Sequence, residues 1–143
     1  MPGAAGAHAS CAFCRILAGE HPASFVLDEP EVAAFLDARP VFKGHVLVVP
    51  RAHVETLSDL PAAGLPVLFG AVQRLARAVE AGLGADGSFV ALNNKVSQSV
   101  PHLHVHVVPR RRKDGLRGFF WPRTKYASDA ERDDYARRIS AAL

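Results

Sequence analysis

The first half of the chain contains three short apolar runs separated by turn residues, a pattern typical of β-strands. The runs lie at 24–29, 32–37 and 44–50, with Glu29-Pro30 between the first two and Pro50 at the end of the third. Because these runs are rich in β-branched and aromatic residues, they predict an antiparallel meander. The turn residues at 84–87 precede another such run, so a further strand is expected at 88–93.

The middle of the chain changes to the three- and four-residue spacing of a helix. Within 59–83, Leu68, Val72 and Leu75 recur on one face, and two early prolines move the expected beginning of the helix toward Leu65. A Ser-x-x-Glu capping box opens the last predicted helix. Shorter helices are expected at 11–19 and 128–143.

The most regular alternation in the chain carries the histidines His102, His104 and His106. In a strand, residues two apart share one face, so the imidazoles are expected on one face and the aliphatic residues on the other. His102 and His106 would lie about 13 Å apart, too far for one metal ion to bind all three. The row indicates part of a metal site, or nucleophilic and acid–base chemistry on phosphorus, and one strand can serve both.

Short polar side chains precede the histidine row and could hydrogen-bond phosphate oxygens or a leaving group. The alternative is an ordinary polar turn. These residues are Asn93, Asn94, Gln98 and Ser99.

The two cysteines, Cys11 and Cys14, have the C-x-x-C spacing of metal and redox sites. No strand is expected before them, which disfavours a thioredoxin-like redox motif. With His53 and His102 they form a Cys₂His₂ set, which matches the ligands of tetrahedral structural zinc. A metal-free thiol pair is the alternative. Competing histidine ligands are His8, His21 and His45.

Length and charge limit the classes of protein. The 143 residues suit one domain, and no apolar run approaches the roughly 18 residues of a membrane span. Since the first residues also lack the pattern of a secretory signal, we expect a cytoplasmic protein that does not bind membranes. The net charge is +3, yet residues 110–125 carry +6, leaving −3 for the remainder. This distribution favours a local anion-attracting segment and makes nucleic acid an unlikely partner.

The sequence HLHVHVV resembles the signature of the histidine triad (HIT) superfamily. CAFCRILAGE, VAAFLDARPVFKGHVLVVPRAH and QSVPHLHVHVVPR also occur in that family's usual order, so the resemblance covers about 11–110. It implies an α+β fold with an antiparallel sheet of about five strands, one long helix, and short N- and C-terminal helices. We expect a flexible tail at 1–10 and one domain at 11–143, whose core is 11–110. The resemblance also implies a homodimer in which two sheets join into one.

The resemblance further implies a nucleotide hydrolase or transferase that reacts at the α-phosphate. Its middle histidine, here His104, would be the nucleophile and form a nucleotidyl-histidine intermediate. His106 would hold phosphate oxygens, with His45 as a supporting residue. In zinc-carrying members the ligands correspond to Cys11, Cys14, His53 and His102. The remaining expected contacts are Ser99 and Gln98 near the leaving group and bridging phosphate, Asp37 at the ribose and Asn93 at the phosphate.

The loop before the motif departs from the family pattern. The family commonly has Asn-x-Gly and then a glycine before the glutamine, whereas NNKVSQ lacks both glycines and is about two residues shorter. Backbone amides should then approach a phosphate less freely, and the charge of Lys95 could substitute.

Two other functions stay open. One is a non-catalytic nucleotide- or protein-binding module that uses 110–125 as its contact surface. The other is a metal-dependent hydrolase with all three motif histidines on zinc. In the tail, Phe119, Phe120 and Trp121 could stack on a base or pack against the terminal helix.

Overall fold

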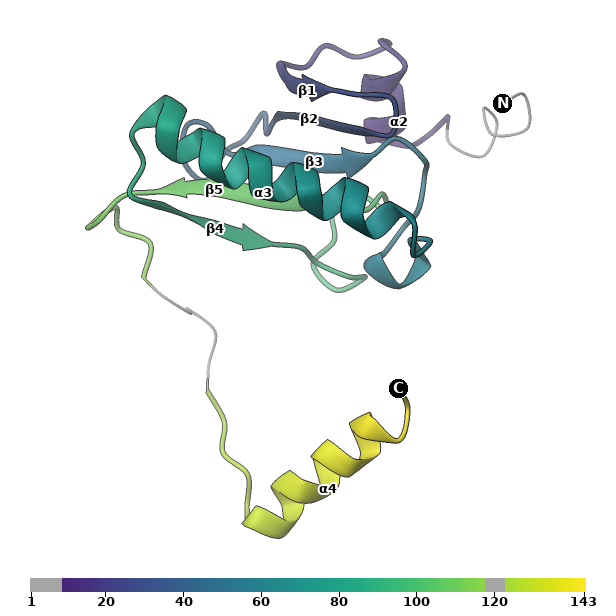
Figure 1. The fold of residues 1–143 in the computed structure, drawn as a ribbon, viewed down its shortest axis with the longest axis vertical. Coiled ribbons are helices and arrows are strands. Elements are labelled where there is room, and N and C mark those ends of the chain that lie inside the picture. Colours follow the sequence, from purple (N-terminus) through teal and green to yellow (C-terminus); the bar gives the residue numbers. More distant parts are fainter. Residues whose placement is uncertain (1–8, 118–122) are drawn as a thin grey trace.

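The computed structural model describes residues 9–117 and 123–143, and it consists of one sheet with helices on both faces (Figure 1). The predicted tail at 1–10 and the aromatic residues at 119–121 therefore lie largely or wholly outside the described residues. The elements in chain order are α2 (Ala12–Leu17), β1 (Phe25–Asp28), β2 (Val32–Leu36), β3 (Val46–Pro50), a 3₁₀ turn (Leu57–Asp59), α3 (Gly64–Leu83), β4 (Gly87–Ala91), β5 (Val105–Arg110) and α4 (Asp129–Ser140).

The sheet has the order β1-β2-β3-β5-β4, and every neighbouring pair is antiparallel. The first three strands form the predicted meander, and β5 then inserts between β3 and β4. This architecture confirms the expected α+β fold with five strands and one long helix. The order also leaves β1 and β4 as the two edges of the sheet.

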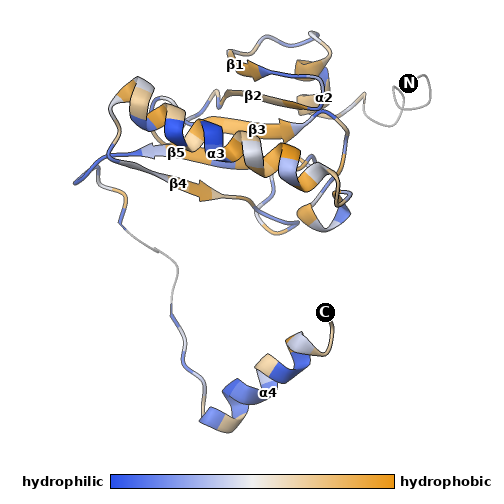
Figure 2. Ribbon diagram, viewed as in Figure 1, coloured by the Kyte–Doolittle hydropathy of each residue, from blue (hydrophilic) through white to orange (hydrophobic). Residues whose placement is uncertain are grey.

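Two apolar clusters hold the sheet and helices together. One lies between α3 and the sheet and includes Leu68, Leu75 and Val105. The other lies under α2 on the opposite face and includes Phe13 and Phe35, whose rings meet edge to face with centroids 5.4 Å apart. Figure 2 shows the hydrophobic residues concentrated in the strands and on α3. Burial on both faces explains why β2 and β3 are apolar throughout rather than alternating.

The long helix begins at Gly64, close to the position that the prolines predicted. The residues before it form the separate 3₁₀ turn, and the helix ends at Gly84, whose φ of 66° suits glycine. Among the described residues, no helix is both long and apolar enough to cross a membrane.

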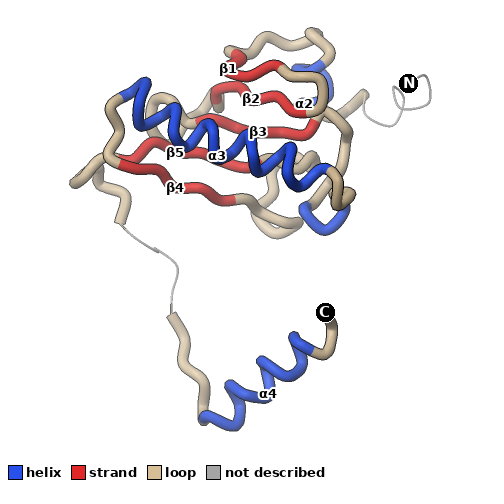
Figure 3. Tube along the Cα trace, in the orientation of Figure 1, coloured by secondary structure: helices blue, strands red, loops and turns tan. Residues whose placement is uncertain are grey.

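The histidine row is less strand-like than predicted, because β5 begins only at Val105 (Figure 3). His102 and His104 precede it in a loop, where the main-chain N–H of Leu103 donates to the oxygen of Val54 rather than to a neighbouring strand. The alternation of faces nevertheless persists: Leu103 packs toward α3, whereas the His102 and His104 rings contact Phe13 of α2. A loop thus presents two of the three imidazoles.

The C-terminal helix stands apart from the sheet and α3, on the side of β4 (Figure 1). Ser128 accepts a hydrogen bond from the N–H of Glu131, as the capping box predicted. The apolar residues Tyr135 and Ile139 of this helix are exposed at 48% and 65%.

Candidate functional site

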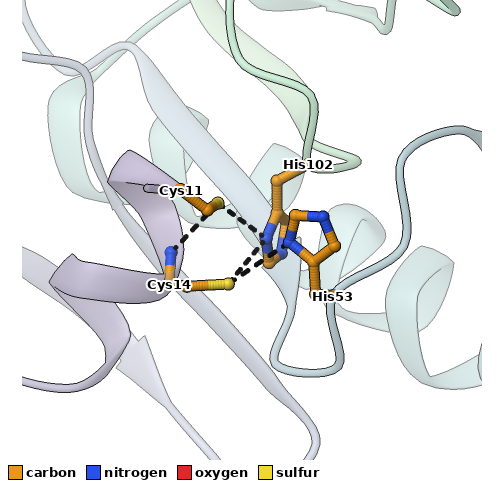
Figure 4. Close-up of side chains that lie close together, drawn as sticks. All are labelled: Cys11, Cys14, His53 and His102. Carbon is orange, nitrogen blue, oxygen red and sulfur yellow. Dashed lines mark hydrogen bonds between the residues drawn. The ribbon is translucent and has the colours of Figure 1, made fainter. Parts of the chain in front are cut away.

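Two thiols and two imidazoles meet beside α2 (Figure 4). Cys11 is the N-cap of α2, and its Sγ accepts a hydrogen bond from the main-chain N–H of Cys14 at 3.4 Å. Cys14 Sγ lies 3.3 Å from Nδ1 of His53 and 3.5 Å from Nδ1 of His102. Cys11 Sγ also lies 3.5 Å from that nitrogen of His102. The structure therefore brings together the four residues that the sequence grouped.

The spacing of these atoms fits a tetrahedral zinc ion. Zinc binds sulfur at about 2.3 Å and imidazole nitrogen at about 2.0–2.1 Å, so sulfur and nitrogen ligands of one tetrahedral ion lie about 3.6 Å apart. The observed sulfur–nitrogen distances of 3.3 to 3.5 Å are close to that value. His21 is exposed and His45 belongs to a different cluster, so neither joins this set.

The protonation states of the cluster depend on whether a cation is bound. Burial and the adjacent Cys11 together raise the pKa of the Cys14 thiol to about 12. A bound metal ion favours the thiolate form and would offset this shift. The fully buried His102 donates from Nε2 to the main-chain oxygen of Pro50 at 2.8 Å. Since that oxygen can only accept, Nδ1 is the unprotonated nitrogen and faces the sulfurs.

His104 is held in one tautomer by the residue two positions before it. Its Nδ1 lies 2.7 Å from the main-chain oxygen of His102 and must donate to it. The lone pair therefore resides on Nε2, which makes no hydrogen bond to any residue that the structure describes. The ring is 5% exposed, and the edge-to-face contact with Phe13 fixes its plane. A buried imidazole held in this tautomer, with the lone pair on Nε2, has the arrangement of a nucleophile.

A second chain of hydrogen bonds fixes the tautomer of His106. The main-chain N–H of Val41 donates to Nδ1 of His45 at 3.1 Å, so that nitrogen is unprotonated. His45 then carries its proton on Nε2 and donates to Nδ1 of His106 at 2.9 Å. It follows that neutral His106 bears its own proton on Nε2, as a donor available to an anion. The ring centroids of His104 and His106 are 5.0 Å apart, so the N–H donor of His106 and the lone pair of His104 belong to neighbouring rings.

His106 remains neutral because several effects oppose its protonation. Burial, followed by the nearby His104 and His45, lowers its pKa to about 4, although Asp37 acts in the opposite direction. Burial also lowers the pKa of His45. At neutral pH the pair therefore acts through oriented N–H groups and not through positive charge.

Asp37 lies beside these histidines at the wall of a cavity. Its Oδ2 is 3.7 Å from Nδ1 of His45, and its Oδ1 accepts from the N–H of Arg39 at 2.9 Å. The cavity encloses about 550 Å³. Its walls are mostly apolar, and its lining includes Phe13, Ile16, Ser24, Phe35, Leu36, Asp37 and Leu47. Such a cavity, with a carboxylate near the imidazoles, suits a flat apolar ring attached to a group bearing hydroxyls.

The polar residues of the loop at 93–99 form hydrogen bonds within the loop and with a neighbouring segment. Gln98 accepts from the N–H of Lys95 at 2.8 Å and donates to the main-chain oxygen of Glu55 at 2.6 Å. The amide of Asn93 donates to the oxygen of Ser97 at 3.3 Å. Ser99 is exposed and forms no hydrogen bond with the part of the chain that the structure describes. Gln98 and Asn93 are thus held in place by this loop and its neighbour, a role that sequence reasoning did not anticipate.

The two residues that stand where the family commonly has glycine both adopt left-handed backbone conformations. Lys95 has φ of 68° and Ser97 has φ of 61°. Left-handed conformation costs residues other than glycine about 1–2 kcal/mol, so the loop keeps its shape at the expense of stability.

The basic segment after β5 uses its first two arginines within the fold. Arg110 forms two hydrogen bonds with the carboxylate of Asp114, which holds the pKa of that carboxyl far below its usual range. Arg111 donates to the main-chain oxygens of Leu83 and Gly84 at the end of α3. Because Asp114 and the end of α3 occupy these two guanidinium groups, Arg110 and Arg111 are less available to an anion than the later basic residues of the segment at 110–125.

The sequence comparisons identify relatives across most of the chain. The HIT domain family model matches residues 18–113. An uncharacterised HIT-like protein of Mycobacterium tuberculosis is 41% identical over 108 residues, which are 74% of this chain and 75% of that protein.

Three relatives have names that state an activity. An adenosine 5′-monophosphoramidase of Candida albicans is 31% identical over 80% of each chain. An adenylylsulfatase of Arabidopsis thaliana is 30% identical over 74% of this chain and 55% of its own. A bis(5′-nucleosyl)-tetraphosphatase of Schizosaccharomyces pombe is 38% identical over 57% of this chain and 46% of its own.

Solved structures share the fold. The crystal structure of a HIT family member from Bacillus subtilis is 33% identical, with a TM-score of 0.85 over 94% of this chain and 97% of that chain. A zinc-bound histidine triad family protein from Mycobacterium smegmatis is 34% identical, with a TM-score of 0.72 over 94% of this chain and 99% of that chain. The fold, the family model and these relatives agree: the chain belongs to the HIT family.

Proposed function

We propose that this protein is a nucleotide hydrolase or transferase that cleaves nucleotidyl substrates at the α-phosphate through a covalent nucleotidyl-His104 intermediate. The observation that carries the proposal is the hydrogen bond from Nδ1 of His104 to the oxygen of His102, which leaves Nε2 as the nucleophilic nitrogen. The named activities of the relatives all concern nucleotidyl compounds, which supports the substrate class. Candidate substrates are dinucleoside polyphosphates, adenosine 5′-phosphoramidates and acyl or aminoacyl adenylates.

In the first step, Nε2 of His104 attacks the α-phosphorus and the bond from phosphorus to the leaving group breaks. The leaving group takes up a proton, with Ser99 as the donor that assists it. The positive charge that develops on the imidazole is stabilised by the oxygen of His102, which faces its Nδ1–H. The N–H of His106 donates to a non-bridging phosphate oxygen, and Asp37 accepts from the ribose hydroxyls.

In the second step, water attacks the same phosphorus and the bond from phosphorus to His104 breaks. The products are the nucleoside monophosphate, neutral His104 and one proton from the water, which replaces the proton that Ser99 passed to the leaving group. The imidazole carries a positive charge in the intermediate and leaves as a neutral group, which makes this step feasible. The base would occupy the apolar cavity beside Asp37.

We further propose that Cys11, Cys14, His53 and His102 bind a structural zinc ion. The sulfur–nitrogen spacing supports this assignment, and the zinc-bound relative is consistent with it. Four protein ligands close such a site, so the zinc would stabilise the fold around His102 without taking part in the reaction.

We also propose a homodimer in the cytoplasm, joined along the β4 edge. The edge position of β4 and the 43% exposure of Val90 on it support such pairing, because an unpaired strand edge readily accepts another strand. Light scattering of purified protein should give twice the chain mass, and Val90→Asp should yield monomers. A monomeric wild type would contradict the dimer.

The function is tested by product identification. Diadenosine tetraphosphate, adenosine 5′-phosphoramidate and an acyl adenylate are incubated separately with zinc-loaded protein, and the products are separated chromatographically. Release of AMP from at least one substrate is expected. Unchanged substrates at high protein concentration, together with tight AMP binding, would instead indicate a binding module.

A further inference from the structure

One short segment links the Cys/His cluster to the loop at 93–99. This connector, residues 53–57, begins with His53, whose Nδ1 lies 3.3 Å from Cys14 Sγ. At its other end, buried Thr56 is fixed by Asp59, which accepts from both the Thr56 hydroxyl at 2.7 Å and its main-chain N–H at 3.1 Å. The connector is therefore anchored at both ends.

Three hydrogen bonds tie the connector to the chain before His104. The N–H of Leu103 donates to the oxygen of Val54 at 2.7 Å, and Gln98 donates to the oxygen of Glu55 at 2.6 Å. The N–H of Leu57 donates to Oδ1 of Asn94 at 2.9 Å.

Among these three contacts, the one at Asn94 depends on a side chain that the reaction does not require. Leu103 contributes only its main chain, and Gln98 is a candidate phosphate contact in its own right. Asn94 is exposed, and the mechanism assigns it no task. Asn94 nevertheless directly precedes Lys95, one of the two left-handed residues that shape the loop.

We propose that Asn94 is a positioning residue that couples the zinc site to nucleotide binding by holding the loop at 93–99 on the connector. Zinc orders His53, the connector presents the N–H of Leu57, and Asn94 fixes the loop conformation that receives the phosphate. This proposal rests on the proposed function for its ligand, a nucleoside monophosphate. Because coupling of two binding equilibria is reciprocal, AMP must strengthen zinc binding by the factor by which zinc strengthens AMP binding.

The test compares Asn94→Leu with wild type and with Gln73→Leu, a matched amide-to-leucine change on the exposed face of α3. AMP affinity is measured by calorimetry on zinc-loaded protein. Zinc affinity is measured by competition with a chelator, with and without saturating AMP. Asn94→Leu should bind AMP about three- to tenfold more weakly, as expected for the loss of one hydrogen bond. AMP should also strengthen its zinc binding less than that of wild type, since the contacts of Gln98 and Leu103 with the connector remain. Gln73→Leu should match wild type in both measurements.

Hydrogen exchange separates this proposal from the proposed function. The Leu57 amide should exchange faster in Asn94→Leu than in wild type, and Asn94→Asp, which keeps the accepting oxygen, should restore its protection. Equal AMP affinity and an equal effect of AMP on zinc binding in Asn94→Leu and wild type would overturn the proposal. Failure of wild type to bind AMP would instead refute the proposed function. The exchange of the Leu57 amide would still test whether Asn94 holds the loop on the connector. If Asn94→Leu loses AMP affinity but also melts at a lower temperature and holds less zinc than wild type, the role of Asn94 is purely structural. That result would also overturn the proposal.

Discussion

The main-chain oxygen of His102 accepts a hydrogen bond from Nδ1 of His104 at 2.7 Å, so one histidine of the motif sets the tautomer of the next. His102 is itself fixed by Pro50 and faces the two cysteine sulfurs. The candidate metal cluster and the candidate nucleophile are thus joined by three residues of backbone. Loss of the cluster should therefore lower the reaction rate, because it would displace the carbonyl group of His102 that orients the His104 ring.

Zinc content provides the first prediction. Protein purified without chelators should carry about one zinc ion per chain, because four ligands of suitable type and spacing are present. Cys14→Ser should lose zinc and melt at a lower temperature. Metal analysis and thermal unfolding check both results, with Ser58→Ala, an exposed position outside the cluster, as the control. A wild-type protein that holds negligible zinc and melts at the same temperature with and without added zinc would contradict the assignment of a structural zinc site.

The lowered pKa of His106 predicts a loss of stability in acid. In the folded protein its pKa is about 4, whereas an unfolded histidine titrates near 6.5. Between these values the unfolded chain binds a proton that the folded chain does not, so stability should fall as pH decreases from about 6.5 to about 4. Urea unfolding at several pH values measures this slope.

Acid also protonates the metal ligands, so the contribution of His106 must be isolated by a variant. His106→Asn should show a shallower loss of stability over the same pH range, with the same zinc content at pH 7. Identical slopes in wild type and variant would show that His106 does not carry the effect.

The left-handed loop predicts a stabilising substitution. Ser97→Gly should raise the free energy of unfolding by up to about 1 kcal/mol, because the relief of backbone strain exceeds the added entropy of the unfolded chain. Val96→Gly is the matched control: Val96 does not have positive φ, so glycine there should destabilise the protein. Chemical denaturation checks both. A destabilised Ser97→Gly would mean that the left-handed conformation is not costly.

The exposed cations of the basic segment should lower KM more for highly charged substrates than for weakly charged ones. Arg110 and Arg111 are engaged within the fold, whereas Arg112 and Lys113 expose their side chains. Replacing the latter two with glutamine should raise KM for diadenosine tetraphosphate about two- to fivefold at low salt and raise it less for a phosphoramidate. Arg77→Gln on α3 is the control. Equal changes for both substrates that do not depend on salt would exclude this role.

The sequence predicted the elements well because they depend on local signals, and it indicated the Cys/His cluster through residue types. Apolar spacing located α3 and the meander, and the types and spacing of Cys11 and Cys14, together with the available histidines, pointed to the cluster that the structure forms. The sequence did not predict the hydrogen bonds that involve main-chain atoms far away in the sequence. Nothing local shows that Leu103 bonds to Val54 and so delays the beginning of β5, or that the end of α3 occupies Arg111. The direction of the His45–His106 bond likewise required the position of Val41.

The central claim is that His104 is the nucleophile, and rapid acid-free quenching during turnover of an α-labelled substrate tests it most directly. Wild type should retain label as an acid-labile phosphoramidate on His104. His104→Asn should retain none, and its turnover should fall by roughly a thousandfold or more, because the covalent route is lost. Its zinc content and AMP affinity should remain near those of wild type. Labelling of His104→Asn equal to that of wild type, or retention of most of its turnover, would contradict the mechanism.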